Sequence, residues 1–325
     1  MTSPFAGLEV ERALRPTAKA FEFDLDRCLS SVVALEARVS DDAFTAETLG
    51  TERVGNAIVI GAQGLLLTIG YLVTEADEVI LTTGDGRRVP AHVLGIDQAT
   101  GFGLIHALEP LDLPALPLGD SRRLRSEEVV IAAGGGGRAH ALSGRLLTRA
   151  PFAGYWEYHL DEALFVEPNH PHWSGAALIN ASGALVGVGS LRVEQRTSDG
   201  HVRPLNMFVP SQLLAPILDN LARGRPAGPA RPWLGVFAQE LDNHVVVLGV
   251  SSDSPAASVD LHRGDIIRQV AGQRVTDLAS FYAHLWALGP AGVLAPLIVQ
   301  RGHEMFEVEI PSADRASKLM RRRLN

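Results

Sequence analysis

Residues 54–60 read VGNAIVI and residues 65–68 read LLLT, two short apolar runs separated by a turn that contains Gly61 and Gly64. Short apolar runs bounded by turn residues are typical of β-strands whose faces are buried. We therefore predict a strand over each of these two runs.

The same pattern continues along the chain. Turn residues are frequent, with 32 Gly and 19 Pro among 325 residues, and Gly84-Asp85-Gly86 follows an apolar run in the manner of a hairpin. Many short strands without alternating helices favour antiparallel barrels or sandwiches over a parallel sheet. The further predicted strands are 78–82, 88–94, 103–108, 128–133 and 142–147.

A helix and a linker divide the chain. Apolar residues recur at helical spacing over 211–221, with Ser211 as the expected N-cap, and residues 223–232 are too rich in Pro and Gly for a helix or strand. Beyond this linker we predict strands at 245–250, 266–270 and 297–301 around a helix at 278–288, and a short helical turn capped by Ser254.

Composition narrows the function classes. Lys plus Arg is 29 and Asp plus Glu is 37, so the net charge is −8, which disfavours nucleic acid as the main partner. The single cysteine, Cys28, is expected to be a buried structural thiol. The first twenty residues hold no leader-like apolar stretch and no run approaches the ~20 residues of a membrane helix. We expect a cytoplasmic protein without a membrane segment, or a periplasmic one if the start codon is misassigned.

Short motifs recur along the chain in a fixed order. Before the linker they lie at 54–60, 66–68, 76–79, 85–87, 95–97, 116–121 and 208–211, and after it at 231–236, 254–257 and 261–267. In this order they resemble the HtrA-type trypsin-fold serine proteases that carry a C-terminal PDZ domain. The resemblance covers roughly residues 28–312.

The resemblance implies a mainly β chain, with a trypsin-like double β-barrel followed by a PDZ domain. The expected organisation is an N-terminal segment at 1–27, the protease-fold domain at 28–222, the linker at 223–232, the PDZ domain at 233–312 and a basic tail at 313–325. The tail ends with the basic run 321–323, which we interpret as solvated.

The resemblance also locates the catalytic positions. Serine-protease chemistry needs a nucleophile, an imidazole base and a carboxylate that orients the base. Residues 172–176, HWSGA, align with the family's nucleophile motif and put Ser174 in that position, but Tyr71 stands in place of the histidine and Gly101 in place of the aspartate. Loss of such a base costs about 10⁶ in kcat, so Ser174 is interpreted as vestigial.

Two histidines flank Pro171 next to this serine. His172 stands where the family has glycine, so we expect it to disturb the oxyanion hole. His170 and His172 leave three interpretations open: a substitute base for Ser174, a metal site with Glu167 as a third ligand, or two polar residues on an exposed loop. We expect no metal and no other cofactor.

The second domain is expected to bind peptides. Trp233, Leu234, Gly235 and Val236 resemble the PDZ carboxylate-binding loop, and a peptide would add as a strand between this loop and the helix that carries Tyr282 and Leu285. In the first domain, the aromatic cluster at 155–158 is expected to pack its loop against the barrel, with peptide contact as the alternative.

These observations predict a non-catalytic, chaperone-like or scaffold-like protein that binds peptides or protein C-termini. The alternatives are an active serine endopeptidase that uses Ser174 with an unrecognised base, and a structural subunit that binds nothing at either site. The resemblance also implies a homotrimer built from the N-terminal segment, where Phe21 and Phe23 could pack.

Overall fold

The computed structural model describes residues 4–5, 7–196 and 200–320, so the basic run at 321–323 lies outside the described residues. The chain divides into two compact units. The first comprises residues 1–150, 162–227 and 320–325, and the second comprises residues 151–161 and 228–319.

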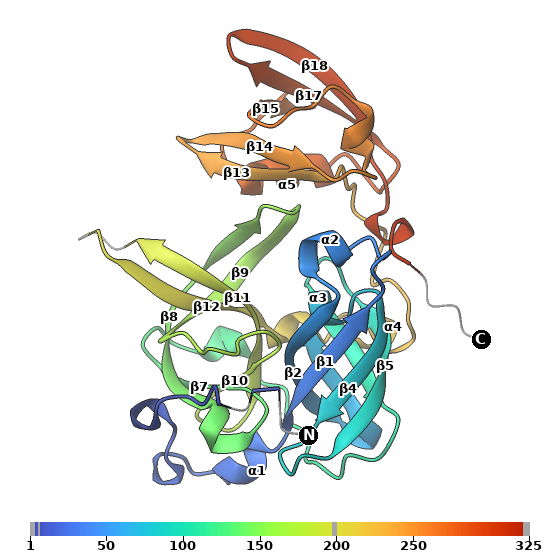
Figure 1. Cartoon of the computed structure of the whole chain (residues 1–325). Helices are drawn as coiled ribbons and strands as arrows, with labels where there is room; N and C mark the ends of the chain where they lie inside the picture. Colours follow the sequence, from blue (N-terminus) through green and yellow to red (C-terminus); the bar gives the residue numbers. More distant parts are fainter. Residues whose placement is uncertain (1–3, 6, 197–199, 321–325) are drawn as a thin grey trace. The chain divides into compact units, whose positions relative to one another are not determined.

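The first unit contains two closed antiparallel barrels of six strands each (Figure 1). In the first barrel the strand order is β1-β2-β3-β6-β5-β4, and the fully buried side chains of Leu35, Ile58 and Leu67 fill its interior. Its strands are β1 (Val32–Val39), β2 (Glu52–Gly61), β3 (Leu65–Ile69), β4 (Ala76–Thr82), β5 (Arg88–Ile96) and β6 (Phe102–Ala107).

In the second barrel the strand order is β10-β11-β12-β9-β8-β7, and buried side chains such as Leu142, Leu178 and Phe208 form its core. Its strands are β7 (Val129–Ala133), β8 (Ala141–Gly154), β9 (Tyr158–Glu167), β10 (Ala177–Ile179), β11 (Leu185–Arg196) and β12 (Val202–Pro210).

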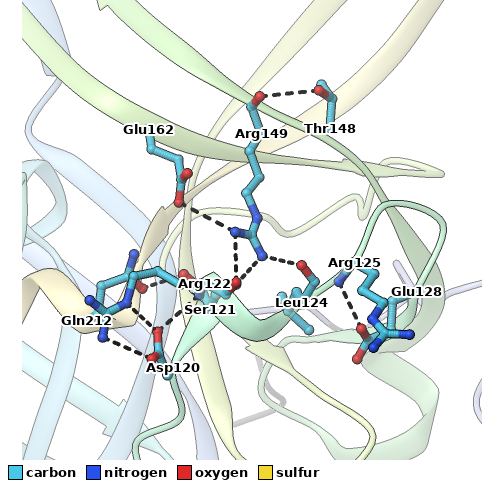
Figure 2. A network of polar contacts seen from close by, with 10 residues as sticks. All are labelled: Asp120, Ser121, Arg122, Leu124, Arg125, Glu128, Thr148, Arg149, Glu162 and Gln212. Carbon is cyan, nitrogen blue, oxygen red and sulfur yellow. Dashed lines mark hydrogen bonds and ion pairs between the residues drawn. The ribbon is translucent and has the colours of Figure 1, made fainter.

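Residues 120–128, which lead into the second barrel, are held against that barrel by Arg149. Figure 2 shows the Arg149 guanidinium on β8 donating to the carbonyl oxygens of Ser121 and Leu124, with the Glu162 carboxylate on its other side. Because a guanidinium holds several donors in a rigid fork, this side chain helps to fix segment 120–128, together with backbone hydrogen bonds between Glu127, Glu128 and Leu146.

The helices of the first unit are short, and one differs from its prediction. The residues predicted as one helix at 211–221 form a 3-10 turn, Ser211–Leu213, and a separate α4 (Leu218–Ala222). Pro216 lies between them and has no N–H to continue a helix. Ser211 does not cap it; its hydroxyl donates to the Gly119 carbonyl at 2.9 Å. The others are α1 (Leu25–Leu29), α2 (Ala46–Leu49) and α3 (Gly70–Val73), with 3-10 turns at Arg12–Leu14, Ala18–Ala20, Ala62–Gly64, Ser121–Arg123 and Gly137–His140.

The second unit is a sheet with one main helix, α5 (Leu278–Trp286), whose Phe281, Tyr282 and Leu285 are fully buried. The sheet order is β13-β14-β15-β17-β18, with β16 paired to β15. Ser254 caps a 3-10 turn, Pro255–Ser258, as predicted. The strands are β13 (Val236–Leu241), β14 (His244–Val250), β15 (Ile266–Val270), β16 (Gln273–Arg274), β17 (Leu294–Arg301) and β18 (Glu304–Pro311), and a further 3-10 turn lies at Arg315–Ser317.

The predicted fold class is confirmed: the chain is mainly β, with a trypsin-like domain followed by a PDZ domain. Each strand predicted from the sequence is present, and the hairpin at residues 84–86 joins β4 to β5. Among the described residues, no helix has the length and apolar character needed to cross a membrane.

Candidate functional site

The site is built where the two barrels of the first unit meet. Tyr71 lies on α3, directly after β3, and Ser174 lies in the loop between β9 and β10. The backbone of Tyr71 is held by Arg53 of β2, a buried arginine whose Nη1 donates to the carbonyl oxygens of Tyr71 and Thr74, both at 2.8 Å. This support fixes where the phenol points.

The Tyr71 hydroxyl lies 2.8 Å from Ser174 Oγ and 2.7 Å from the carbonyl oxygen of Ser190. A carbonyl oxygen can only accept, so the phenol satisfies both contacts when it donates to Ser190 and accepts from the Ser174 hydroxyl. The structure thus brings the nucleophile position and the base position of the sequence analysis into direct contact.

Burial raises the pKa of Tyr71 to about 12, and its side-chain hydrogen bonds offset that rise only in part. At pH 7 the residue is therefore a neutral phenol. A general base must accept a proton near the working pH, and a neutral phenol does not do this. Tyr71 holds the Ser174 hydroxyl in place without activating it.

The orienter position contains a backbone turn. Gly101, with a φ of 81°, accepts a hydrogen bond from the Gly70 N–H at 2.7 Å through its carbonyl oxygen. The nearby carboxylate of Asp97 accepts from the Thr100 N–H and hydroxyl at 2.7 and 2.8 Å. The carboxylate closest in sequence is thus used to shape the turn.

The backbone before Ser174 is fixed by a buried histidine. His170 Nε2 donates to the His140 carbonyl oxygen at 2.9 Å, which leaves its Nδ1 to accept from the His172 N–H at 3.0 Å. Burial lowers the pKa of His170 to about 4, consistent with this neutral tautomer. In the family arrangement that the resemblance implies, the amide at position 172 would serve the oxyanion hole, and here it donates to an imidazole instead.

These contacts revise the interpretations of the histidine pair. His170 is fully buried, so the prediction of an exposed polar residue is wrong for it. Both of its ring nitrogens are hydrogen-bonded, so it has no lone pair left for a metal or for the Ser174 proton. Glu167 Oε2 pairs with Arg203 at 2.9 Å, and His172 Nε2 lies 2.7 Å from the Leu8 carbonyl oxygen. These three side chains do not converge as a ligand set.

Sequence reasoning missed Asn56, a fully buried residue of β2 that organises the serine loop. Its Nδ2 donates to the carbonyl oxygens of His172 and Ser174, both at 2.9 Å, and its Oδ1 accepts from the Gly135 N–H at 2.8 Å. A polar residue in the middle of an apolar strand was the available signal, because buried amides are retained where hydrogen bonds satisfy them.

The N-terminal segment packs on the same loop. The ring of Phe5 lies 4.2 Å from that of His172. Phe21 and Phe23, predicted to pack in a trimer, lie 5.3 Å apart by ring centroid, and a Cβ added to Gly183 would approach the Phe23 ring to 3.0 Å.

Cys28 is buried, and burial raises its pKa to about 11, as expected of an inert thiol.

In the second unit, the predicted carboxylate loop (residues 233–236) brings three backbone amides together. The N–H groups of Leu234, Gly235 and Val236 converge on one carboxylate, that of Glu157. Gly235 has a φ of 80°, and a Cβ there would lie 2.0 Å from Ser254 Cβ, so the turn itself requires glycine. The side chains of Trp233, Leu234, Val236, Tyr282 and Leu285 are buried, and all except that of Trp233 belong to the core of the unit.

Comparison with known proteins agrees with this architecture. Residues 55–188 match the family described as a trypsin-like peptidase domain, and residues 232–311 match the PDZ domain family. A protein of Pseudomonas fluorescens named "Probable periplasmic serine endoprotease DegP-like" is 26% identical over 272 residues, covering 80% of this chain and 56% of the relative. The "Serine protease Do-like HtrA" of Lactobacillus helveticus is 24% identical over 267 residues, covering 74% and 63%. The chain thus spans somewhat more than half the length of these relatives.

Solved structures show the same fold. The "HtrA-type protease AlgW with decapeptide" has a TM-score of 0.54 and 22% identity, covering 90% of this chain and 97% of that one. The serine endoprotease from Yersinia pestis has a TM-score of 0.52 and 20% identity, covering 90% and 98%. The fold and the matches define a trypsin-like serine protease homologue with a C-terminal PDZ domain. Within that class, the chain is similar to HtrA-type proteins, in agreement with the resemblance carried by its sequence motifs.

The expected cytoplasmic location is wrong. The relatives from Pseudomonas are named periplasmic endoproteases, and this finding contradicts the location inferred from the first twenty residues. A chain with one buried thiol needs no disulfide, so its cysteine content neither requires nor excludes an oxidising compartment.

Proposed function

We propose that this chain is a proteolytically inactive HtrA homologue that binds peptides or protein segments in a chaperone-like or scaffold-like role. The observation that carries the proposal is the 2.8 Å contact between the Tyr71 hydroxyl and Ser174 Oγ. The residue that would have to accept the serine proton is a neutral phenol, and a triad without its base loses about 10⁶ in kcat.

Two further features support inactivity. Gly101 offers a backbone carbonyl where an orienting carboxylate is needed, and the His172 N–H donates to His170 Nδ1. An intact oxyanion hole supplies about 10³–10⁴ over water even without a triad. Because one of its expected donors is already engaged, even this residual catalysis is expected to be low.

The binding role is supported by the PDZ domain. Its three converging amides form a site for a carboxylate, and β13 offers a strand edge to which a peptide can add. One structural neighbour is named as a complex with a decapeptide. By analogy with the named relatives, we propose that the protein is periplasmic. The homotrimer stays a prediction, which light scattering can check.

Casein hydrolysis and labelling of Ser174 by a fluorophosphonate probe test the inactivity. Both signals should be no higher than those of Ser174→Ala, which defines the background. Casein turnover that disappears in Ser174→Ala would contradict the proposal and favour a serine endopeptidase with an unrecognised base.

A further inference from the structure

The turn between β8 and β9 carries the aromatic cluster at residues 155–158. This cluster was expected to pack against the barrel, but residues 151–161 form part of the second unit, together with the PDZ sheet. Glu157, the one charged residue within the cluster, places its carboxylate in the carboxylate loop.

The contacts resemble those of a bound ligand. Glu157 Oε1 accepts from the Gly235 N–H at 2.6 Å and from the Val236 N–H at 2.9 Å, and Oε2 accepts from the Leu234 N–H at 3.0 Å. Successive backbone amides turned toward one point capture a peptide's terminal carboxylate in such loops. Here a side chain of the same chain satisfies them.

The backbone of the turn is docked as well. The Ala238 N–H of β13 donates to the Tyr155 carbonyl oxygen at 3.0 Å, which is the kind of bond that an added strand makes with a sheet edge. On the other side, the Tyr282 hydroxyl of α5 donates to the Gly154 carbonyl oxygen at 2.6 Å and accepts from the Glu157 N–H at 3.3 Å. The turn therefore contacts both walls expected to hold a peptide.

The conformation of Glu157 is an independent observation. Its φ is 59°, in the left-handed region, and hairpin turns favour glycine or asparagine at positions with a positive φ. A glutamate is disfavoured there because its Cβ crowds the following carbonyl oxygen. The hydrogen bonds of its carboxylate offset this strain, which explains why a long acidic side chain occupies a turn position suited to glycine.

We propose that Glu157 is an internal ligand of the carboxylate loop, and that a peptide C-terminus reaches this loop only after the turn at 154–157 has left it. The inference rests on the proposed peptide-binding function and adds its regulation. The external ligand is a peptide with a free terminal carboxylate, which replaces the Glu157 carboxylate on the same three amides.

Amide hydrogen exchange tests the internal ligand without any peptide. In the full chain, the amides of residues 234–238 should exchange at least about tenfold faster in Glu157→Ala than in the parent, with Glu157→Gln in between, because the glutamine side chain keeps one of the two acceptor oxygens. Asp161→Ala is the matched control, because this substitution removes one carboxylate from the same hairpin at a position where the side chain is fully exposed. Unchanged exchange in both Glu157 variants would overturn the proposal.

Peptide titration tests the competition. A peptide with an apolar last residue and a free carboxylate should bind Glu157→Ala about tenfold or more tighter than the parent or Asp161→Ala, and its amidated form should bind none of them. Equal affinity for the parent and Glu157→Ala would overturn the competition. If no variant binds the peptide while residues 234–238 exchange faster in Glu157→Ala, the internal ligand stands and the peptide-binding function fails. Thermal unfolding of each variant checks that it is folded.

Discussion

The docking of Glu157 should weaken as the pH rises. Burial raises the pKa of this carboxyl to about 7 from an ordinary value of 4.5, and its three backbone amide donors lower it only in part. When the turn leaves the loop, the carboxyl returns to water and to its ordinary pKa. Between these two values the docked form keeps a proton that the undocked form has lost, so docking is strongest below pH 4.5 and weakens as the pH rises through 7.

The size of the effect follows from the same values. The difference, 7 − 4.5 = 2.5 pKa units, corresponds to at most about 3 kcal/mol. Glu157 keeps some solvent exposure, so we expect a smaller change of about 2 kcal/mol, or roughly thirtyfold in the opening equilibrium.

The Ala238 amide reports this equilibrium, because it donates to Tyr155 in the docked turn. Its opening free energy, measured by native-state hydrogen exchange from pH 5 to 8, should fall with pH in the parent relative to Glu157→Gln. The neighbours Arg315, Tyr282 and Glu240 are present in both proteins, so their own titration affects both opening free energies and cancels when the two are subtracted. A difference that stays constant across this range would refute the reasoning.

Two further predictions concern the first unit. The double variant Tyr71→His, Gly101→Asp should hydrolyse casein no faster than the same variant with Ser174→Ala added. The reasons are that the His172 N–H is engaged by His170 and that an aspartate is strained at a φ of 81°. Turnover typical of an intact serine protease would show that the oxyanion hole is sound. Arg53→Met leaves the buried carbonyl oxygens of Tyr71 and Thr74 without their donor and should destabilise the fold by about 3 kcal/mol, seen as a lower Tm. Arg38→Met removes only the exposed ion pairs with Glu52 and Glu78 and should lower the Tm much less. Equal shifts in Tm for both variants would contradict the role of Arg53.

Much of the fold could be predicted because its signals are local. The apolar runs at 54–60 and 65–68 and the turn at 84–86 encode strands and a hairpin through neighbouring residues. β18 is among the strands that were missed, because its five exposed positions interrupt the apolar pattern along Glu304–Pro311. The helix at 211–221 was overpredicted because its apolar spacing was read without the effect of Pro216.

The candidate site was predictable only in part. Motif order located Tyr71, Gly101 and Ser174, but the hydrogen bonds of His170 and Asn56 depend on how distant loops pack. Glu157 and Leu234 are separated by 77 positions, and nothing near either residue in the sequence indicates their contact. Such pairings arise from tertiary structure. The left-handed conformation of Glu157 is likewise visible only in the structure, because the sequence does not give its φ.

The attachment of Glu157 to the domain that it occupies sets a threshold for outside ligands. A ligand that belongs to the same chain as its receptor meets it at an effective concentration that can reach about millimolar, whereas a free peptide must reach the loop from dilute solution. Isolated C-termini at low abundance therefore compete poorly. If the domain binds C-termini as proposed, many termini presented together would raise their local concentration and displace the turn more effectively than single ones.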